Sequence, residues 1–169
     1  MITKENLSNL IFNNMKYFGF IKEHDQGNYA KNISELILSD QQENTHRNMV
    51  LEYLKKGELC VALMGFVENA NSPYFDTDTY DDDDDDFIGY LSIYTDGKWF
   101  WPEYIIAYIE KYPNIIINDE FLNHVLKNRS KEKKLSKNEI LKLEKTYLKK
   151  ANFKKIAEAF NINYNIIRS

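Results

Sequence analysis

Cysteine, glycine, proline and histidine are all scarce in this chain of 169 residues. The sequence holds one cysteine, six glycines, three prolines and three histidines. A single thiol excludes an intramolecular disulfide, so nothing here indicates an oxidising compartment. Six dispersed glycines exclude a glycine-rich phosphate loop, and no histidine or cysteine lies at metal-ligand spacing from another. We therefore expect a protein without catalytic residues, cofactor or metal. An enzyme that uses a dispersed Asp/Glu pair is the catalytic alternative that these absences leave open.

Long apolar runs are missing as well. No stretch approaches the roughly 20 apolar residues that span a bilayer, and the N-terminus has no continuous apolar segment of the secretory kind. We expect no membrane association and a cytoplasmic location. The lone Cys60 lies in an apolar run, which favours a small buried hydrophobe over a reactive thiol.

Apolar and aromatic residues are plentiful enough for a core. The apolar fraction is 43% and the aromatic fraction is 14%, which argues against a disordered chain. The length suits one domain. We expect a single α+β domain over residues 1–169, in which residues 127–169 form a basic helical C-terminal extension.

Periodicity and capping signals predict helices near both ends of the chain. Thr3 begins a helix that Gly19 ends, a short helix spans residues 33–37, and Asp40 with Glu43 forms the capping box of a helix that Gly57 closes. Further helices are expected over residues 103–111, from Asn118 or Asp119 onward, from the Ser136 and Glu139 capping box to Lys150, and over residues 152–160.

The middle of the chain predicts strands. The run 59–67 is nearly continuous and apolar, which indicates a buried strand, and residues 87–94 and 98–101 resemble two more. Asp96-Gly97 is a hairpin-turn signal between the last two, and Pro102 suits the first position of the following helix. The predicted fold is thus α+β, with a small antiparallel sheet of about three strands flanked by N-terminal and C-terminal helices.

Two segments of opposite charge stand apart from the rest. Residues 68–86 hold nine acids and no Lys or Arg, whereas residues 127–155 hold twelve basic residues and three Glu. Six adjacent aspartates repel one another and must extend into water. Three interpretations of the acidic run remain open: a solvated loop without a partner, an anionic surface that docks on a basic protein, and a loose calcium site that lacks the spacing of a known calcium loop.

If the acidic run binds a partner, its flanking aromatic residues are expected to add buried contact area. The predicted partner-binding residues are Tyr74, Phe75, Asp78, Tyr80, Asp81, Asp82, Asp83, Asp84, Asp85 and Asp86.

The basic segment ends in a pattern similar to a helix-turn-helix over residues 153–168. The turn lacks the usual glycine, and the second helix would be short. A pair of basic amphipathic helices packed on the domain is the simpler interpretation. If the segment binds nucleic acid, the expected contact residues are Lys149, Lys150, Lys154, Lys155 and Arg168.

Residues 94–124 hold a further pattern. Tyr94-Thr-Asp-Gly-Lys-Trp-Phe-Trp-Pro102 is followed by Tyr104, Tyr108, Tyr112 and Glu120-Phe-Leu-Asn-His124. This resembles a family of small bacterial proteins with a T-D-G-x-W-x-W-P motif, a tyrosine-bearing helix and E-F-x-x-H. Members are similar in character to the immunity proteins of bacterial toxin systems. The resemblance covers about residues 89–124, and the acidic run lies outside the shared pattern.

The motif also has a structural explanation. Asp96-Gly97 makes a turn, and Trp99 and Trp101 project from one face of a strand, where paired tryptophans are more often core than binding surface. The resemblance implies an immunity or antitoxin-like protein that binds a cognate toxin domain and occludes its active site. The acidic run makes a basic nuclease one candidate for that toxin. A nucleic-acid-binding regulator that uses the C-terminal segment is the alternative.

Overall fold

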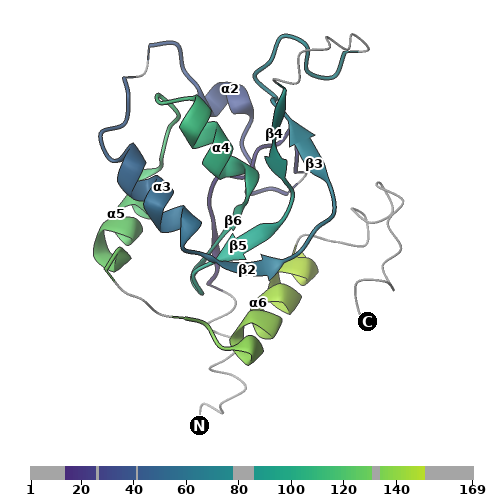
Figure 1. The fold of residues 1–169 in the computed structure, drawn as a ribbon, viewed down its shortest axis with the longest axis vertical. Coiled ribbons are helices and arrows are strands. Elements are labelled where there is room, and N and C mark those ends of the chain that lie inside the picture. The colour runs from purple at the N-terminus through teal and green to yellow at the C-terminus, as the bar shows by residue number, and fades with distance from the viewer. Residues whose placement is uncertain (1–13, 26, 41, 78–85, 131–133, 151–169) are drawn as a thin grey trace.

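The computed structural model describes residues 14–25, 27–40, 42–77, 86–130 and 134–150. Within these residues the chain combines helices and strands, so the predicted α+β class is confirmed (Figure 1). The elements follow in the order β1 (Lys16–Tyr17), α2 (Ile33–Leu36), α3 (Arg47–Lys55), β2 (Glu58–Val61), β3 (Phe66–Glu68), β4 (Phe87–Tyr90), β5 (Ile93–Thr95), β6 (Trp99–Pro102), α4 (Tyr104–Lys111), α5 (Asp119–Asn128) and α6 (Lys137–Lys150).

The described strands form two sheets. In the larger sheet the order is β1-β6-β5-β2, where β5 pairs antiparallel with both β6 and β2, and β1 pairs parallel with β6. Strands β3 and β4 form a separate antiparallel pair. The sheet is therefore mixed and has more strands than the sequence predicted, because a short N-terminal segment joins its edge.

The β5–β6 hairpin closes at the predicted turn. Gly97 has a φ of +94°, a conformation that glycine adopts without steric cost. The Asp96 Oδ1 accepts hydrogen bonds from the backbone N–H groups of Lys98 and Trp99, each at 2.8 Å. The buried Thr95 hydroxyl donates to the Trp99 carbonyl at 2.7 Å. These bonds fix the turn and its acidic side chain in one geometry.

Alternation along β6 divides the core between the two faces of the sheet. Trp99 and Trp101 pack into a cluster with residues of α3, α4 and α5, as the sequence predicted. Phe100, between them, joins a second cluster with Leu143 and Tyr147 of α6. Helix α6 contacts β2 at the edge of the sheet (Figure 1). The sheet is thus covered on both sides.

Local signals placed the later helices well. The predicted inward residues of α4 (Tyr104, Ile105, Tyr108 and Ile109) are all buried. The Asn118 side chain caps α5 by accepting from the Phe121 N–H at 2.7 Å. Ser136 and Glu139 form the predicted capping box at the start of α6.

The predicted N-terminal helix is wrong where the structure describes it. Lys16 and Phe18 donate backbone hydrogen bonds to the carbonyls of Lys98 and Phe100, so this stretch is strand β1 and its flank. Pairing with β6 outweighs the helical spacing of the apolar residues, since propensity is a weak prior. The capping box at Asp40 is also wrong, because α3 begins seven residues later, at Arg47.

Both long predicted strands are divided in the structure. The run 59–67 splits into β2 and β3 at Gly65, whose φ is +149°. The run 87–94 splits into β4 and β5, which belong to different sheets. Pro102 is the last residue of β6 rather than the first of a helix, and α4 begins at Tyr104. The periodicity of the sequence identified the apolar runs, but it did not predict the bends that divide each run into two strands.

Candidate functional site

The predicted partner-binding set lies only partly within the described residues. Asp78, Tyr80, Asp81, Asp82, Asp83, Asp84 and Asp85 lie outside them. Tyr74 is half exposed, whereas Phe75 is partly buried with its ring 5.9 Å from that of His24. The Asp86 carbonyl accepts from the Asn69 N–H at 2.7 Å, which joins the end of the acidic run to the end of β3. Tyr74 is therefore open to a partner, and Phe75 packs its segment against the domain.

Of the predicted nucleic-acid contacts, only the first two belong to described elements. Lys149 is exposed near the end of α6, and Lys150 is the last residue of that helix. Lys154, Lys155 and Arg168, with the rest of the helix-turn-helix pattern, lie outside the described residues. The structure therefore shows a basic helix but leaves the pattern after it undescribed.

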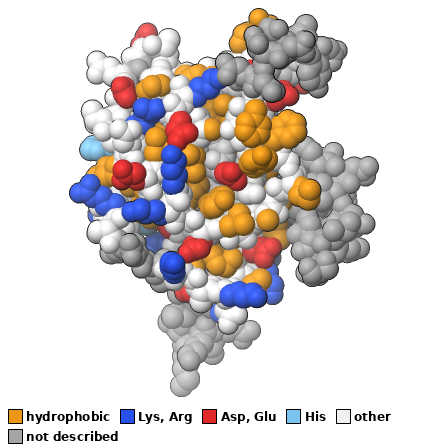
Figure 2. Space-filling view, viewed as in Figure 1, with side chains coloured by type: hydrophobic (Ala, Val, Ile, Leu, Met, Phe, Trp, Pro, Cys, Tyr) orange, Lys and Arg blue, Asp and Glu red, His pale blue; other side chains and the backbone are white. Residues whose placement is uncertain are grey.

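Three exposed aromatic side chains gather on the outer face of the β3–β4 pair. Phe66, Phe87 and Tyr90, which we call the aromatic surface, are 64%, 51% and 52% exposed. The Phe87 ring lies 6.2 Å from the Phe66 ring and 5.5 Å from the Tyr90 ring. Figure 2 shows hydrophobic side chains gathered on this face of the molecule. The predicted burial of residue 66, as part of the run 59–67, is therefore wrong.

The reason for this exposure is the direction of the pleat. Val67 is buried in the core and pairs with Gly89, so its neighbour Phe66 points outward together with its cross-strand partner Tyr90. The register shift between Val67 and Glu68 leaves Ile88 and Gly89 both buried, and Phe87 before them points outward. Acidic groups border the aromatic surface: Glu68 pairs with Phe87 across the strands, and Asp86 directly precedes Phe87. The result is an apolar centre with a negative edge, continuous in sequence with the acidic run.

A buried polar cluster lies under the β5–β6 turn, and it was not predicted from the sequence. We call it the Asp96 network. The Asp96 Oδ2 lies 2.6 Å from the Tyr53 hydroxyl and 2.5 Å from the His124 Nε2. The Asp96 and His124 side chains are 14% and 13% exposed. The network joins α3, the hairpin and α5, which are far apart in the sequence.

Protonation in the Asp96 network follows from its hydrogen bonds. Burial opposes ionisation of Asp96, but donation from His124, Tyr53 and two backbone N–H groups lowers its pKa below the ordinary value. Burial and the nearby carboxylate raise the pKa of Tyr53, so its hydroxyl keeps its proton. The Asn128 amide nitrogen lies 3.2 Å from the His124 Nδ1 and can only donate, which places the imidazole proton on Nε2.

This arrangement differs from a catalytic dyad. In a catalytic dyad the carboxylate orients the imidazole so that its second nitrogen can take a proton from a nucleophile. Here that second nitrogen already accepts from Asn128 of its own helix. The Asp96 network therefore fastens the hairpin to α3 and α5, and it leaves the imidazole no free lone pair.

The Asp96 network forms part of the wall of an open groove of about 590 Å³. The groove lies between the hairpin, the end of α3, the end of α5 and the start of α6. Basic side chains line it from all four segments: Lys56, Lys98, Arg129 and Lys142. Trp101, Leu135 and Leu143 add an apolar part. Sequence reasoning missed the groove because three stretches far apart in the chain form it: the end of α3, the β5–β6 hairpin, and the end of α5 with the start of α6.

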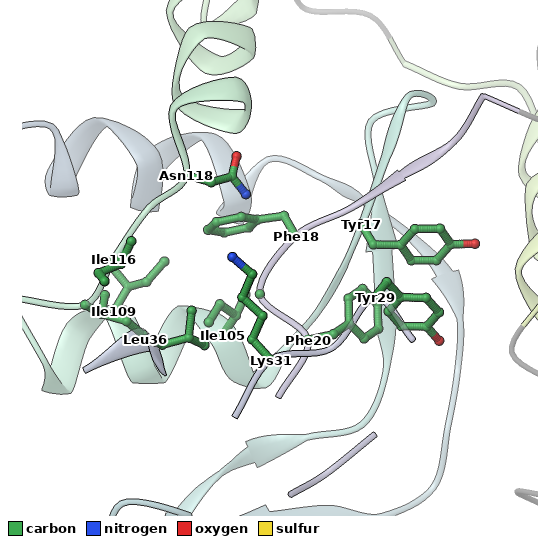
Figure 3. A pocket seen from close by; sticks show the side chains of 12 residues that line it. Tyr17, Phe18, Phe20, Tyr29, Lys31, Leu36, Ile105, Ile109, Ile116 and Asn118 are labelled. Atoms are coloured by element: carbon green, nitrogen blue, oxygen red, sulfur yellow. The ribbon is translucent and has the colours of Figure 1, made fainter. Parts of the chain in front are cut away.

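A second cavity, of about 50 Å³, lies between β1, α2 and α4. In Figure 3 the Lys31 side chain extends toward Phe18 and Asn118, and the remaining wall is largely apolar. A space of this size holds no more than a few waters. It is an imperfection of packing rather than a ligand site.

The described residues include no group of three or more His, Cys, Asp or Glu side chains that could hold a metal ion. In the described part of the chain, no helix is both long and apolar enough to cross a membrane. No family model, curated protein or solved structure matches the chain. Any function must therefore be argued from the surfaces themselves.

Proposed function

We propose that this protein is an immunity or antitoxin-like inhibitor that binds a cognate toxin domain and occludes its active site. The observation that carries this proposal is the aromatic surface on β3–β4 with its acidic border. The proposed partner is a protein with a basic surface, such as a nuclease whose active site faces a phosphate backbone. The activity is binding, and the inhibitor needs no catalytic residue.

Exposed aromatic side chains support a role in protein binding. Large apolar patches on soluble monomers usually mark interaction sites, and aromatic residues dominate the energetics of interfaces. The Phe87 ring contacts those of Phe66 and Tyr90, which are paired across the strands, so a partner could cover all three together. Tyr74, also half exposed, precedes the acidic run and is a further candidate contact.

The charge of this region indicates a basic partner. Residues 68–86 carry nine acids and no Lys or Arg. Complementary charge speeds association and excludes wrong partners, while buried aromatic contacts supply most of the affinity. A dense row of carboxylates resembles the phosphate backbone that a nuclease binds. We therefore assign affinity to the aromatic surface and steering to the acidic residues, including Asp82, Asp83, Asp84 and Asp85.

The resemblance to immunity proteins supports the class of the proposal but not the location of the surface. Its motif residues lie in the hairpin, α4 and α5, where Trp99 and Trp101 are buried. None of Phe66, Phe87 and the acidic run belongs to the motif. A shared frame with a variable binding region fits inhibitors that must each recognise a different toxin.

The test begins with the tagged full chain in its native cell. Proteins that co-purify at gentle salt are identified, and the candidate toxin domain is then expressed and assayed for inhibition by the pure protein. Phe87→Ala and Tyr90→Ala are each expected to weaken binding by at least about tenfold. Leu126→Ala, which removes an exposed leucine from α5, is the matched control and should bind like the wild type.

Neutralising Asp82 to Asp85 with asparagine should slow association and flatten its salt dependence, with a smaller effect on dissociation. A toxin that binds all these variants as tightly as the wild type would remove the proposed surface. A partner that binds without losing activity would contradict inhibition.

The nucleic-acid alternative stays a prediction. Lys142, Lys145 and Lys149 are exposed on α6 at spacings of three and four residues, which puts them on one side of the helix. Duplex binding that falls steeply with salt would favour this alternative, and no binding at low salt would dispose of it.

A further inference from the structure

We infer that the groove beside the Asp96 network binds a small phosphate-bearing ligand of about nucleotide size. This inference is independent of the proposed inhibitor function, because the groove and the aromatic surface share no residue. The inference depends on the size of the groove, on the charges that line it and on the rigidity of its walls.

The groove is large enough to hold a small molecule. A volume of about 590 Å³ falls within the range of known small-molecule sites, roughly 300–1,000 Å³. One wall is fixed by the hydrogen bonds from Tyr53 and His124 to Asp96. Preorganised walls lower the entropy that a ligand loses on binding. Hydrogen bonds between side chains of α3, the hairpin and α5 therefore hold this wall of the groove in place.

The charges of the groove favour an anion. Lys56, Lys98, Arg129 and Lys142 are all exposed, and none has a carboxylate partner among the described residues. Three acids oppose these four cations: Glu58, Asp96 and Glu139.

Two of these three acids are already engaged. The Asp96 carboxylate accepts four hydrogen bonds from this chain. The Glu139 carboxylate accepts from the Ser136 backbone N–H and hydroxyl, each at 2.8 Å. The four cations and Glu58 are therefore the charged groups left open to a ligand, and the excess of cations would raise the local concentration of anions.

Phosphate is the anion that this set of groups suits best. The Arg129 guanidinium can present two parallel N–H donors to phosphate oxygens, and three lysines add point charges around it. A single carboxylate would neutralise one cation of the four, whereas a phosphate ester brings nearly two negative charges. The Arg129 side chain contacts the Met49 sulfur at 3.3 Å, a weak bond that phosphate would displace easily.

The apolar wall accommodates the rest of the ligand. Of the apolar residues that line the groove, Leu135 is partly exposed, whereas Trp101 and Leu143 are buried behind the surface. A sugar or ring could pack on Leu135. The buried Trp101 Nε1 has no hydrogen-bond partner among the described residues. An unmade bond of this kind has a cost, and a ligand or water that reached it would remove that cost.

The test titrates the full chain with AMP, with inorganic pyrophosphate and with a short single-stranded oligonucleotide, by calorimetry near physiological salt. We expect saturable AMP binding with a Kd below about 1 mM. Tryptophan fluorescence should change in parallel, because Trp101 lines the groove. Lys98→Gln, Arg129→Gln and Lys142→Gln should each weaken AMP binding by at least about threefold, since each removes one charge-assisted contact.

Lys145→Gln is the matched control, because Lys145 is an exposed lysine of the same helix that does not line the groove. It should bind AMP like the wild type. Absence of saturable AMP binding would overturn the inference, as would an equal loss in Lys142→Gln and Lys145→Gln. Binding of the oligonucleotide alone, weakened by both changes, would also overturn it and assign α6 to nucleic acid instead. Pyrophosphate binding as tight as that of AMP would retain the phosphate site but remove the role of the apolar wall.

Discussion

Asp96 Oδ2 and His124 Nε2 lie 2.5 Å apart, although 28 positions separate the two residues in the chain. Asp96 belongs to the T-D-G part of the motif, and His124 is the last residue of E-F-x-x-H. The Trp99 ring lies 5.0 Å from that of Phe121 and 6.0 Å from that of His124. One packed unit is thus formed by Asp96 of the turn, Trp99 of β6, and Phe121 and His124 of α5. The motif describes how the hairpin is attached to α5.

Asp96→Ala is expected to lower the free energy of unfolding by about 3 kcal/mol. The change leaves the Tyr53 hydroxyl, the His124 Nε2 and two turn N–H groups without their acceptor. Urea unfolding followed by circular dichroism measures the loss. Asp40→Ala, at an exposed aspartate, is the control and should stay within about 0.5 kcal/mol of the wild type. A loss in Asp96→Ala no larger than in the control would show that the network contributes nothing to stability.

The parts of the fold that the sequence predicted are those set by neighbouring residues. Asn118 accepts from a backbone N–H three positions later, and Ser136 with Glu139 closes a box of the same span. Gly97 turns the hairpin within its own segment. Such signals act over one turn of chain, so their spacing alone reveals them.

The predictions that were wrong concern features set by residues far apart in the chain. Strand β1 forms because the backbone N–H groups of Lys16 and Phe18 donate to carbonyls of the hairpin about 80 residues later in the chain. No local sequence pattern predicts a pairing over that distance. Gly65 redirects an apolar run that periodicity reads as one buried strand, and this leaves Phe66 exposed. The groove likewise combines three stretches far apart in the chain. The sequence shows these basic residues, but it does not show that the fold places them around one groove.

Arg47→Ala should destabilise the protein by about 2 kcal/mol. The guanidinium donates to the carbonyls of Ile109 and Glu110, each at 2.7 Å, and so satisfies the last turn of α4 from a different helix. Arg47→Lys keeps the charge but loses the two-donor fork, so it should recover only part of the loss. Thermal unfolding of the three proteins checks the order. If lysine restored full stability, charge alone would explain the contact.

Gly19→Ala should cost more stability than Gly97→Ala. Both glycines have positive φ, +73° and +94°, so alanine is strained by about 1–2 kcal/mol at either position. At Gly19 an added Cβ would also lie 2.3 Å from the Ile105 Cγ1, whereas at Gly97 the nearest atom is a leucine methyl at 3.1 Å. Overpacking should therefore add about 1–3 kcal/mol at Gly19 alone. Equal losses in urea unfolding would mean that α4 moves away without cost.

The stability of the protein should fall between pH 7 and pH 4.5 because of His24. Burial lowers the pKa of His24 to about 4, and its Nε2 lies 2.8 Å from the Tyr108 hydroxyl. Since the unfolded imidazole has the ordinary value near 6.5, the unfolded state binds more protons in this window. The contribution of neutral His24 is complete above about pH 6.5 and decreases by about 2–3 kcal/mol by pH 4.5.

His24→Gln separates this effect from the other titrating groups. Burial raises the pKa of Asp25, so this residue makes the folded state more stable as the pH falls and opposes the effect of His24. The pKa of Asp96 is lowered, so its contribution to stability is lost only below the ordinary aspartate range. Both groups are present in the variant, whereas the imidazole is absent. The difference in unfolding free energy between wild type and His24→Gln should therefore shrink, or change sign, as the pH falls from 7 to 4.5. A difference that stays constant across this window would show that His24 titrates normally in the folded protein.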